Sequence, residues 1–597
     1  MAKKPRSNLF SRFSLAWTRV FATSVFARFL ALYGEWNEGL SQGIFAPFAR
    51  FFASKKYLFL KFKGGFARQV ENSTLSRLCR RYTTFFATLR LKSVGLFFFV
   101  FGICNCLIFL SRRFLSLFGE AESSQLLFGL FATLASLPLF SRRRSLSVAV
   151  KKSRILGALF SEVALLRAED FSRAHSHSAD ALTAFLGFGA GALSLFVNPF
   201  FILLAVFAVV LCALSLYKPE FGAALTLFCL PFVPQNVAAM LTVFVGACLL
   251  FKMLRGRRSA TFDLLTLVSL ILATVVLFCA LSSRLACREQ GLLLLMGILC
   301  FFIFANLSRR RAVFTVLIGA FVAGTASLAA INTLFRFLPE QFVTGALRGF
   351  YLTLTANASP AVALCGAILS LYLVLRAKTG AHKLFSFVAL LLLILDLWIS
   401  ASLSTALSLM ISAAVLLCVS SRALFFCILA LGIGTLVCLP FIEGSQLAFL
   451  FDAFASSAGT PLFSVSGLPG GSFVFGIGAF CPESLSAFGL QGEVLQSLSL
   501  YTQLLLSVGL FGLFVFGVFF LFSFQKAMHF YAAATYNQNR LMALAPLIAS
   551  LALLICGLRL DLMADARTFI LLFSFAAISS ATVDTLKNED AVILNRF

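Results

Sequence analysis

The feature that most constrains this chain is a recurrence of long apolar runs separated by short basic segments. Clear examples are Phe262–Leu281, Gly291–Asn306, Ala312–Ile331, Leu384–Ser400 and Ala423–Phe441. About 20 apolar residues, rising about 1.5 Å each in a helix, cross the roughly 30 Å of hydrocarbon in a bilayer. Because backbone N–H and C=O groups inside lipid must bond to one another, such runs form helices. The chain is therefore predicted to be an integral membrane protein.

The composition supports this prediction, since 60% of the 597 residues are hydrophobic and the mean hydropathy is +0.97. The predicted fold class is all-α, a polytopic integral membrane helix bundle of about 12 to 16 transmembrane helices with one large outer loop. The count is a range because several runs are short, and 220–233 is short enough to be re-entrant. The traced spans are about 94–110, 124–140, 182–197, 199–216, 220–233, 236–252, 262–281, 290–308, 312–331, 357–376, 384–400, 403–419, 423–441, 498–524, 542–557 and 567–583.

The net charge of +26 is distributed between the spans and over the N-terminal region. That distribution suits anionic lipid headgroups and control of topology, and it argues against nucleic acid as a partner. The strongest basic markers are Arg142-Arg143-Arg144, Arg255 with Arg257 and Arg258, and Arg309-Arg310-Arg311. With these segments inside, the positive-inside rule predicts a multi-pass protein of the cytoplasmic membrane with both termini in the cytoplasm.

The chain is expected to divide into four regions. Residues 1–93 mix basic and aromatic residues, and we interpret Arg19–Tyr33 and Phe45–Phe62 as helices on the inner membrane surface. A partner-docking arm is the alternative for this region. The other regions are 94–180, a helical hairpin with a basic cytoplasmic segment; 181–583, the transmembrane core with its outer loop 442–496; and 584–597, a cytoplasmic tail.

Polar residues that interrupt the apolar pattern on the outer side are the places where chemistry is expected. The loop 442–496 carries acidic residues, Glu483 and Glu493 among them, and no Lys or Arg. A loop of this length between membrane helices is often a cap over a cavity, although it can also be a plain surface loop.

Three further outer segments are polar. The segment Arg348–Pro360 contains Asn357, and Ser400–Thr405 contains Ser402. The third, Arg559–Arg567, holds charges of both signs that could simply pair with one another. Hydroxyls at a helix turn could bind a sugar, but capping of helix ends is the more common use.

The 15 cysteines lie mostly inside the spans, where small buried hydrophobic side chains are the usual interpretation. Cys104-Asn105-Cys106 has no second pair at zinc spacing, so that no metal site and no cofactor are predicted. Cys287 and Cys481 are the two that fall in outer loops, where a disulfide between them could form.

Glycine motifs occur in the outer loop and in or beside two of the spans. Gly476-Ile477-Gly478 is followed by Tyr501-x-Gln503 and then by Gly509-Leu510-Phe511-Gly512, and Lys218–Gly222 precedes Leu230-Pro231-Phe232. In this order, and with this topology, the chain over about 180–585 resembles the O-antigen ligase and polymerase family. The resemblance implies a membrane glycosyltransferase that ligates or polymerises glycans on the outer side of the cytoplasmic membrane. Its implied partners are membrane lipid, a polyprenyl-diphosphate-linked glycan, and an acceptor glycan or glycolipid.

The chain departs from the family pattern at positions that would carry chemistry. The family's loop His falls on Leu498, its Asn falls on Ser499, and the Arg of its Thr-x-Ser-Arg-Gly signature falls on Leu403. Its Asn-Pro-Asn falls on Asn357-Ala358-Ser359. Arg348 and Arg567 resemble two arginines that the family retains.

The resemblance gives candidate roles to seven residues. A diphosphate leaving group needs fixed cations, and an acceptor hydroxyl needs a base. With the His absent, Glu493 or Glu483 is the candidate catalytic base. The candidate substrate-binding residues are Arg348, Arg567, Asn357, Ser402 and Tyr501.

Two other functions remain open from the sequence. Leu403 and Leu498 favour a family member without catalytic activity, which binds lipid-linked glycan or scaffolds a cell-envelope complex. A transporter or flippase would need ionisable residues deep in the membrane. Asp396 is the deep acid that the sequence offers for that alternative.

Overall fold

The computed structural model describes the greater part of the predicted helical regions. The described residues are 89–115, 123–140, 179–254, 263–283, 285–337, 358–377, 379–400, 403–420, 474–476, 478, 480, 499–534, 537–560 and 562–594, with isolated positions between 69 and 85 and at 430 and 434. The two predicted membrane-surface helices of the N-terminal region, Arg19–Tyr33 and Phe45–Phe62, lie outside these residues.

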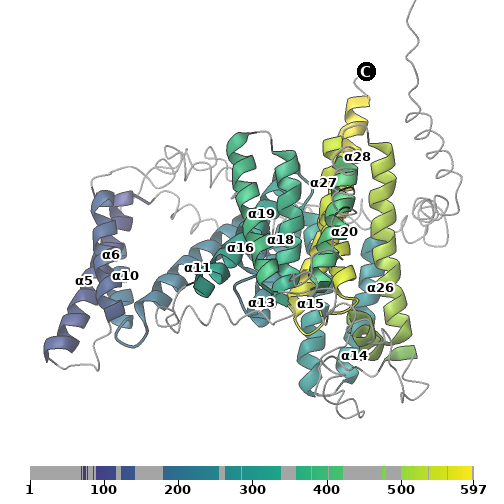
Figure 1. Cartoon of the computed structure of the whole chain (residues 1–597). Helices are drawn as coiled ribbons and strands as arrows, with labels where there is room; N and C mark the ends of the chain where they lie inside the picture. The colour runs from purple at the N-terminus through teal and green to yellow at the C-terminus, as the bar shows by residue number, and fades with distance from the viewer. Residues whose placement is uncertain are drawn as a thin grey trace, which may run out of the picture. The chain divides into compact units, whose positions relative to one another are not determined.

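The elements of the described part are α-helices, which confirms the predicted fold class (Figure 1). Their bounds are α5 Leu91–Leu115, α6 Ser123–Phe140, α10 Asp180–Leu193, α11 Pro199–Tyr217, α12 Pro219–Cys229, α13 Gln235–Leu254, α14 Leu264–Ser282, α15 Leu285–Leu307, α16 Arg311–Phe337, α18 Ala358–Arg376, α19 Gly380–Ser400, α20 Leu403–Ser420, α26 Leu500–Ala533, α27 Asn537–Cys556 and α28 Ala566–Leu594.

Ten of the helices in the described residues are long and apolar enough to cross a membrane, and four shorter ones are also apolar. Every traced span except one overlaps one of the helices given above. The exception, 423–441, lies almost wholly outside the described residues. The protein is therefore a multi-pass membrane protein, as its apolar periodicity predicted.

The chain forms two compact units, and the boundary between them falls within α12 and within α13. Unit 2 comprises residues 61–225 and 245–259, and unit 1 comprises 1–60, 226–244 and 260–597. The four predicted regions have different limits, and they stay predictions.

In unit 2, α5 packs along α6 and α10. Phe101 of α5, Ala132 of α6 and Ile202 of α11 form its buried hydrophobic cluster. Gly102 lies so close to α6 that a Cβ there would come within 2.7 Å of the carbonyl oxygen of Gly129. Small residues allow this approach, as is common where helices pack in membranes.

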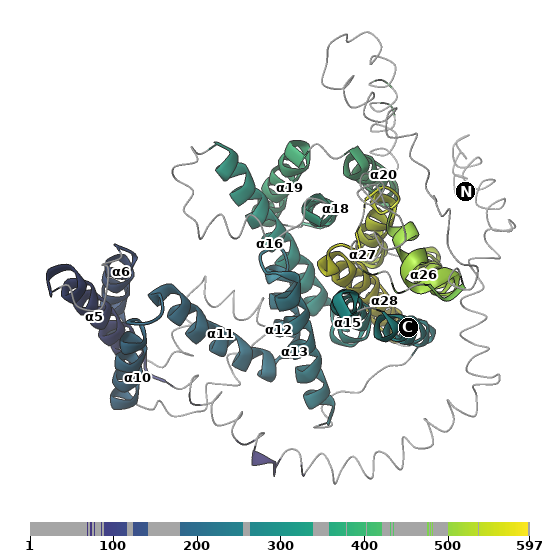
Figure 2. The same cartoon turned by 90° about the horizontal axis from the view of Figure 1, so that it is seen from below.

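In unit 1, α28 is the central helix. It packs against α15, α26 and α27, which Figure 2 shows end-on around it. In the apolar, membrane-crossing part of α28, 89% of the residues are buried inside the protein, against 28% for the peripheral helix α19. Phenylalanine rings fill the contact between α26 and α28, and those of Phe519 and Phe573 lie 5.1 Å apart.

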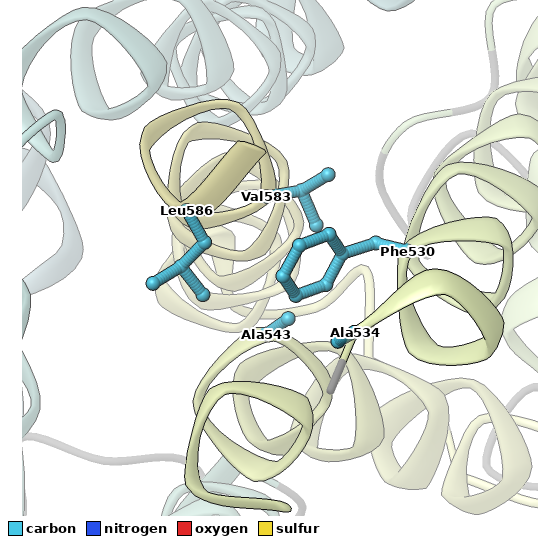
Figure 3. Packing of buried hydrophobic residues seen from close by; sticks show 5 residues of the cluster. All are labelled: Phe530, Ala534, Ala543, Val583 and Leu586. Carbon is cyan, nitrogen blue, oxygen red and sulfur yellow. The ribbon is translucent and has the colours of Figure 1, made fainter. Parts of the chain in front are cut away.

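One end of unit 1 gathers the helix ends that the basic residues predict to be cytoplasmic, and we call it the inner end. There Phe530 of α26 packs against Ala543 of α27 and against Val583 and Leu586 of α28 (Figure 3). The opposite end, predicted to be extracytoplasmic, is called the outer end.

A buried lysine joins three helices at the inner end. Lys526 Nζ of α26 lies 2.8 Å from Asp263 Oδ2, which precedes α14, and 2.9 Å from Asp584 Oδ2 of α28. It also donates to Ser580 Oγ at 2.7 Å. Asp263 in turn caps α14, because its Oδ1 accepts from the backbone N–H of Thr266.

Burial alone would raise the pKa of the Asp263 carboxyl. The charge of Lys526 and the hydrogen bonds from Lys526 and Thr266 outweigh that effect, so that the pKa of Asp263 lies below its ordinary value.

Candidate functional site

Six segments from distant parts of the chain meet at the outer end of unit 1, and we call their meeting place the outer junction. The segments are the turn 230–234 with Gln235 and Asn236, the end of α14 at 279–283, the start of α15 at 287–291, residues 474–476 with 478 and 480, the first turns of α26 at 499–509, and the turn 553–560 with 562–568 between α27 and α28. The glycine motifs and Tyr501-x-Gln503, where they fall in the described residues of unit 1, lie in these segments or directly continue them.

Helix α26 is broken at Gly509, inside the Gly509–Gly512 motif. Gly509 has a φ of 72° and a ψ of −178°, while the residues on either side are helical. The left-handed half of the backbone map is open to glycine and costly for other residues. A broken membrane helix leaves backbone groups without their helical partners, which neighbouring structure must supply.

The glycine loop, Val474–Phe480, supplies one of those partners. The backbone N–H of Gly478 donates to the carbonyl oxygen of Ser507, two residues before the break, at 3.1 Å. Gly476 and Gly478 have positive φ values of 76° and 66°. The two glycine motifs recognised in the sequence thus lie in direct contact.

The contact leaves no room for side chains. A Cβ on Gly476 would lie 2.5 Å from the backbone nitrogen of Gly509, and a Cβ on Gly509 would lie 2.3 Å from the carbonyl oxygen of Val474. The neighbouring atoms belong to the backbone, which cannot rotate away as a flexible side chain could. Glycine is therefore required at both positions for two reasons, the sign of φ and the close backbone approach.

The same loop also touches α14 and α15. Cys279 Sγ of α14 donates to the carbonyl oxygen of Phe475 at 3.4 Å. The ring of Phe480 packs over Gly291 of α15, where a Cβ would come within 3.0 Å of Phe480 Cδ2. The glycine loop is therefore wedged between three helices.

Cys287 lies one helical turn before Gly291 and is disulfide-bonded. Its bonding partner lies outside the described residues, as does the predicted partner, Cys481. That pairing stays a prediction.

Arg567, a predicted substrate-binding residue, is buried in an ion pair. Its side chain and that of Asp565 are each 2% exposed, and its Nη2 lies 2.5 Å from Asp565 Oδ2. Its Nε donates to Asp565 Oδ1 at 2.8 Å, and its Nη1 donates to the carbonyl oxygen of Val233 at 2.7 Å. The pairing of charges that the sequence offered as an alternative for this segment is thus formed.

Two glutamines connect this ion pair with the start of α15. Gln235 Nε2 donates to Gln290 Oε1 at 3.4 Å, and Gln235 Oε1 accepts from the backbone N–H of Ala566 at 3.3 Å. Gln290 Nε2 donates to the carbonyl oxygen of Met563 at 2.9 Å. Since Gln290 precedes Gly291, the first turn of α15 links the Arg567 ion pair to the glycine loop.

Tyr501, the second predicted substrate-binding residue in the described part, fastens α26 to α27. Its Oη donates to the carbonyl oxygen of Leu554 at 2.9 Å, and the backbone N–H of Leu500 donates to the carbonyl oxygen of Gly557. Ser499, at the position of the family's Asn, caps the helix by accepting from the backbone N–H of Thr502. These contacts give both residues structural roles.

The other five predicted site residues lie outside the described residues. They are Arg348, Asn357, Ser402, Glu483 and Glu493. Leu498 lies outside them too. The structure brings Arg567 and Tyr501 to the same end of unit 1, and the remaining assignments stay predictions.

Some residues of the outer junction could not be predicted from the sequence. Gln235 and Gln290 each stand at the start of an apolar run, but no spacing pairs them across 55 residues. Ser507 and Cys279 are ordinary small residues within their spans, and they take part through a carbonyl oxygen and a thiol.

No group of three or more His, Cys, Asp and Glu side chains among the described residues is placed to hold a metal ion. No protein-family model matches the chain, and no curated protein matches it in sequence.

Proposed function

We propose that this protein is a membrane glycosyltransferase-like protein that ligates or polymerises glycans from a polyprenyl-diphosphate carrier on the outer side of the cytoplasmic membrane. The observation that carries the proposal is the contact between the glycine loop and the break in α26. These two motifs carry the resemblance to the ligase and polymerase family. If both belong to one site, as the resemblance implies, they have to lie in contact.

The electrostatics of the outer junction limit how Arg567 could act. Its guanidinium fork is filled by Asp565, so that the pair is neutral and draws a diphosphate only weakly while it stays closed. A role in transfer requires Arg567 to exchange Asp565 for a phosphate oxygen, which accepts the same bidentate geometry. Arg348, the other predicted cation, would then share the charge that develops on the leaving diphosphate.

The test is transfer by purified full-length protein in liposomes. The donor is a polyprenyl-diphosphate glycan with a labelled sugar, and the readouts are transfer to an acceptor glycan and release of polyprenyl diphosphate. Arg567→Lys keeps the charge but loses the fork, and we expect it to lower the rate at least about tenfold, because one lost interaction with the transition state commonly has that size. Arg288→Ala is the control, since it removes a half-exposed basic residue of the same end that is not in the Arg567–Asp565 ion pair and whose Nη2 donates to the carbonyl oxygen of Leu281.

A second candidate is a protein that binds the lipid-linked glycan without transferring it. It is favoured by the closed Arg567–Asp565 pair and by Leu403 and Leu498 at the family's Arg and His positions. Binding of the labelled donor without turnover would identify this candidate. Absence of both binding and turnover in protein that keeps its thermal stability would reject both.

A further inference from the structure

A second polar group lies away from the outer junction, between α16 and α19. Asp396 stands in the apolar helix α19, about one turn from its outer end, and only 9% of the residue is exposed. Asn332 of α16 donates from Nδ2 to Asp396 Oδ1 at 3.3 Å. An ionisable side chain inside a membrane span is costly, and such residues usually have a function.

Two oxygen atoms near this contact have no hydrogen-bond partner among the described residues. They are Asn332 Oδ1 and Thr333 Oγ1, both shielded from solvent. Other hydroxyls of α16 behave differently, since those of Thr315, Thr325 and Ser327 each donate to the carbonyl oxygen one turn back. An unpaired acceptor at this depth calls for a hydrogen-bond donor.

A carboxylate at Asp396 would leave Asn332 Oδ1 unpaired and would place a negative charge within the span. No basic side chain in the described part of the chain forms an ion pair with Asp396. A proton on Oδ2 removes the charge and supplies the missing donor. The neutral acid and the amide can then bond reciprocally, with Asn332 Nδ2–H donating to Asp396 Oδ1 and Asp396 Oδ2–H donating to Asn332 Oδ1.

We propose that Asp396 and Asn332 form a proton-binding site inside the membrane, in which the carboxyl group is protonated at neutral pH and closes a pair of hydrogen bonds with the amide. Proton release breaks the Oδ2–H bond of Asp396 and transfers the proton to a water molecule. It leaves the carboxylate and removes the hydrogen bond to Asn332 Oδ1, while the bond from Asn332 Nδ2 to Asp396 Oδ1 stays. The inference concerns α16 and α19 alone and does not depend on the proposed handling of a glycan.

Among the helices that the structure describes around Asp396, few charged groups can compete with the proton. The helices that pack against α19 are α16, α18 and α20. On α18 and α20 the outer halves carry no acidic or basic residue, and on α19 itself His382 and Lys383 lie about 20 Å away along the helix. Arg336 follows Asn332 by one turn of α16, and its side chain lies outside the described part. An ion pair between Arg336 and Asp396 is therefore the competing arrangement.

The test is infrared spectroscopy of the full-length protein in liposomes between acidic and alkaline pH, because a protonated carboxyl has a C=O band distinct from that of a carboxylate. We expect the band of a buried acid at pH 7, its complete loss in Asp396→Asn, and a shift in its frequency in Asn332→Leu. Asp180→Asn is the control, since Asp180 is a partly exposed acid that pairs with Lys92, and it should leave the band unchanged.

Wild-type protein alone also decides the proposal if the variants fold poorly. Aspartate labelled with carbon-13 must shift the band, and a hydrophobic carbodiimide, which reacts with protonated acids in apolar surroundings, must modify Asp396 at neutral pH. Absence of the band from wild-type protein at pH 7 would overturn the proposal in favour of an ionised Asp396. So would a band that appears only in the Arg336→Gln variant.

Discussion

At the scale of single residues, the outer junction depends on glycines, which have no Cβ atom. Gly476 and Gly509 lie backbone to backbone, and each has a positive φ. The sequence predicted these glycines as parts of one motif set but gave no reason for their identity. The structure provides it, because a methyl group on either residue would overlap the main chain of the other segment.

Gly509→Ala is expected to lower the free energy of unfolding by at least about 2 kcal/mol, because it adds both an unfavourable φ and a backbone overlap. Gly517→Ala in the same helix is the matched control. A Cβ there meets nothing within 4 Å, so that the alanine should be neutral or stabilise by up to about 1 kcal/mol. The midpoints of thermal unfolding in one detergent compare the two variants. Equal midpoints would show that the break in α26 is not needed for the fold.

Arg567 shows the limit of residue-level prediction. A charged residue at the start of a membrane helix can bind a ligand or pair with a neighbour, and the sequence Asp565-Ala566-Arg567 allows both. Burial decides between them in the resting structure, because the guanidinium and the carboxylate are each only 2% exposed and satisfy one another. The local sequence around these two residues does not indicate that they are buried.

At the scale of elements, α26 differs from the single apolar span that its sequence predicted. Apolar periodicity located it at 498–524, but the helix continues to Ala533 and is broken at Gly509. The residues on both sides of Gly509 are equally apolar, so hydropathy could not reveal the break in the helix. Its inner part is tied to α14 and α28 by Lys526, whose carboxylate partners are 263 residues away in one direction and 58 in the other.

The Lys526 contact predicts a dependence of stability on pH. Because the pKa of Asp263 is lower in the folded protein than in the unfolded chain, its contribution is full above the unfolded value of about 3.9 and is lost as the pH falls through the folded value. Asp263→Asn should therefore lower the midpoint of thermal unfolding at pH 7 and make little difference below the folded pKa. We expect a loss of roughly 1 to 3 kcal/mol at pH 7.

Asp180→Asn is a suitable comparison for this variant. Its pair with Lys92 spans 3.6 Å between side chains that are 38% and 50% exposed, and exposed pairs contribute about 0 to 1 kcal/mol. An Asp263→Asn protein with the stability of wild type at pH 7 would show that the carboxylate of Asp263 adds nothing beyond the remaining partners of Lys526.

At the scale of the whole molecule, two independent features agree on orientation. Basic segments predict which helix ends face the cytoplasm. The disulfide at Cys287 belongs to the opposite end, and disulfides persist outside the reducing cytoplasm. The charges and the cysteine chemistry thus favour the same arrangement, with the outer junction facing away from the cytoplasm.

Labelling of intact cells with a membrane-impermeant thiol reagent tests this orientation. Leu558→Cys places a thiol at the outer end, where the leucine is 43% exposed, and we expect it to be labelled in intact cells. Lys383→Cys, near the start of α19 at the inner end, should react only after lysis. Wild-type protein corrects for the native cysteines, and the reverse pattern would invert the predicted topology.

The fold was more predictable from the sequence than the candidate site. Apolar runs form helices because lipid leaves the backbone no other hydrogen-bond partner, and each traced span that lies in the described residues overlaps a helix. The contacts of the outer junction depend on which helix ends meet. Gln235, Gln290 and the carbonyl oxygen of Val233 surround the turn before α28 through packing that no local pattern encodes.

The break at Gly509 and the ammonium group of Lys526 stand 17 residues apart on α26, which is about 25 Å along a helix. The break contacts the glycine loop, and Lys526 is paired with residues of two other segments. From Leu510 to Phe522 the stretch between them is apolar. This spacing is close to the roughly 30 Å of hydrocarbon in an ordinary bilayer. A much thicker membrane would bring lipid chains against one of these features, and a much thinner one would expose apolar surface to water. The length of α26 between these two features therefore suits a bilayer of ordinary thickness.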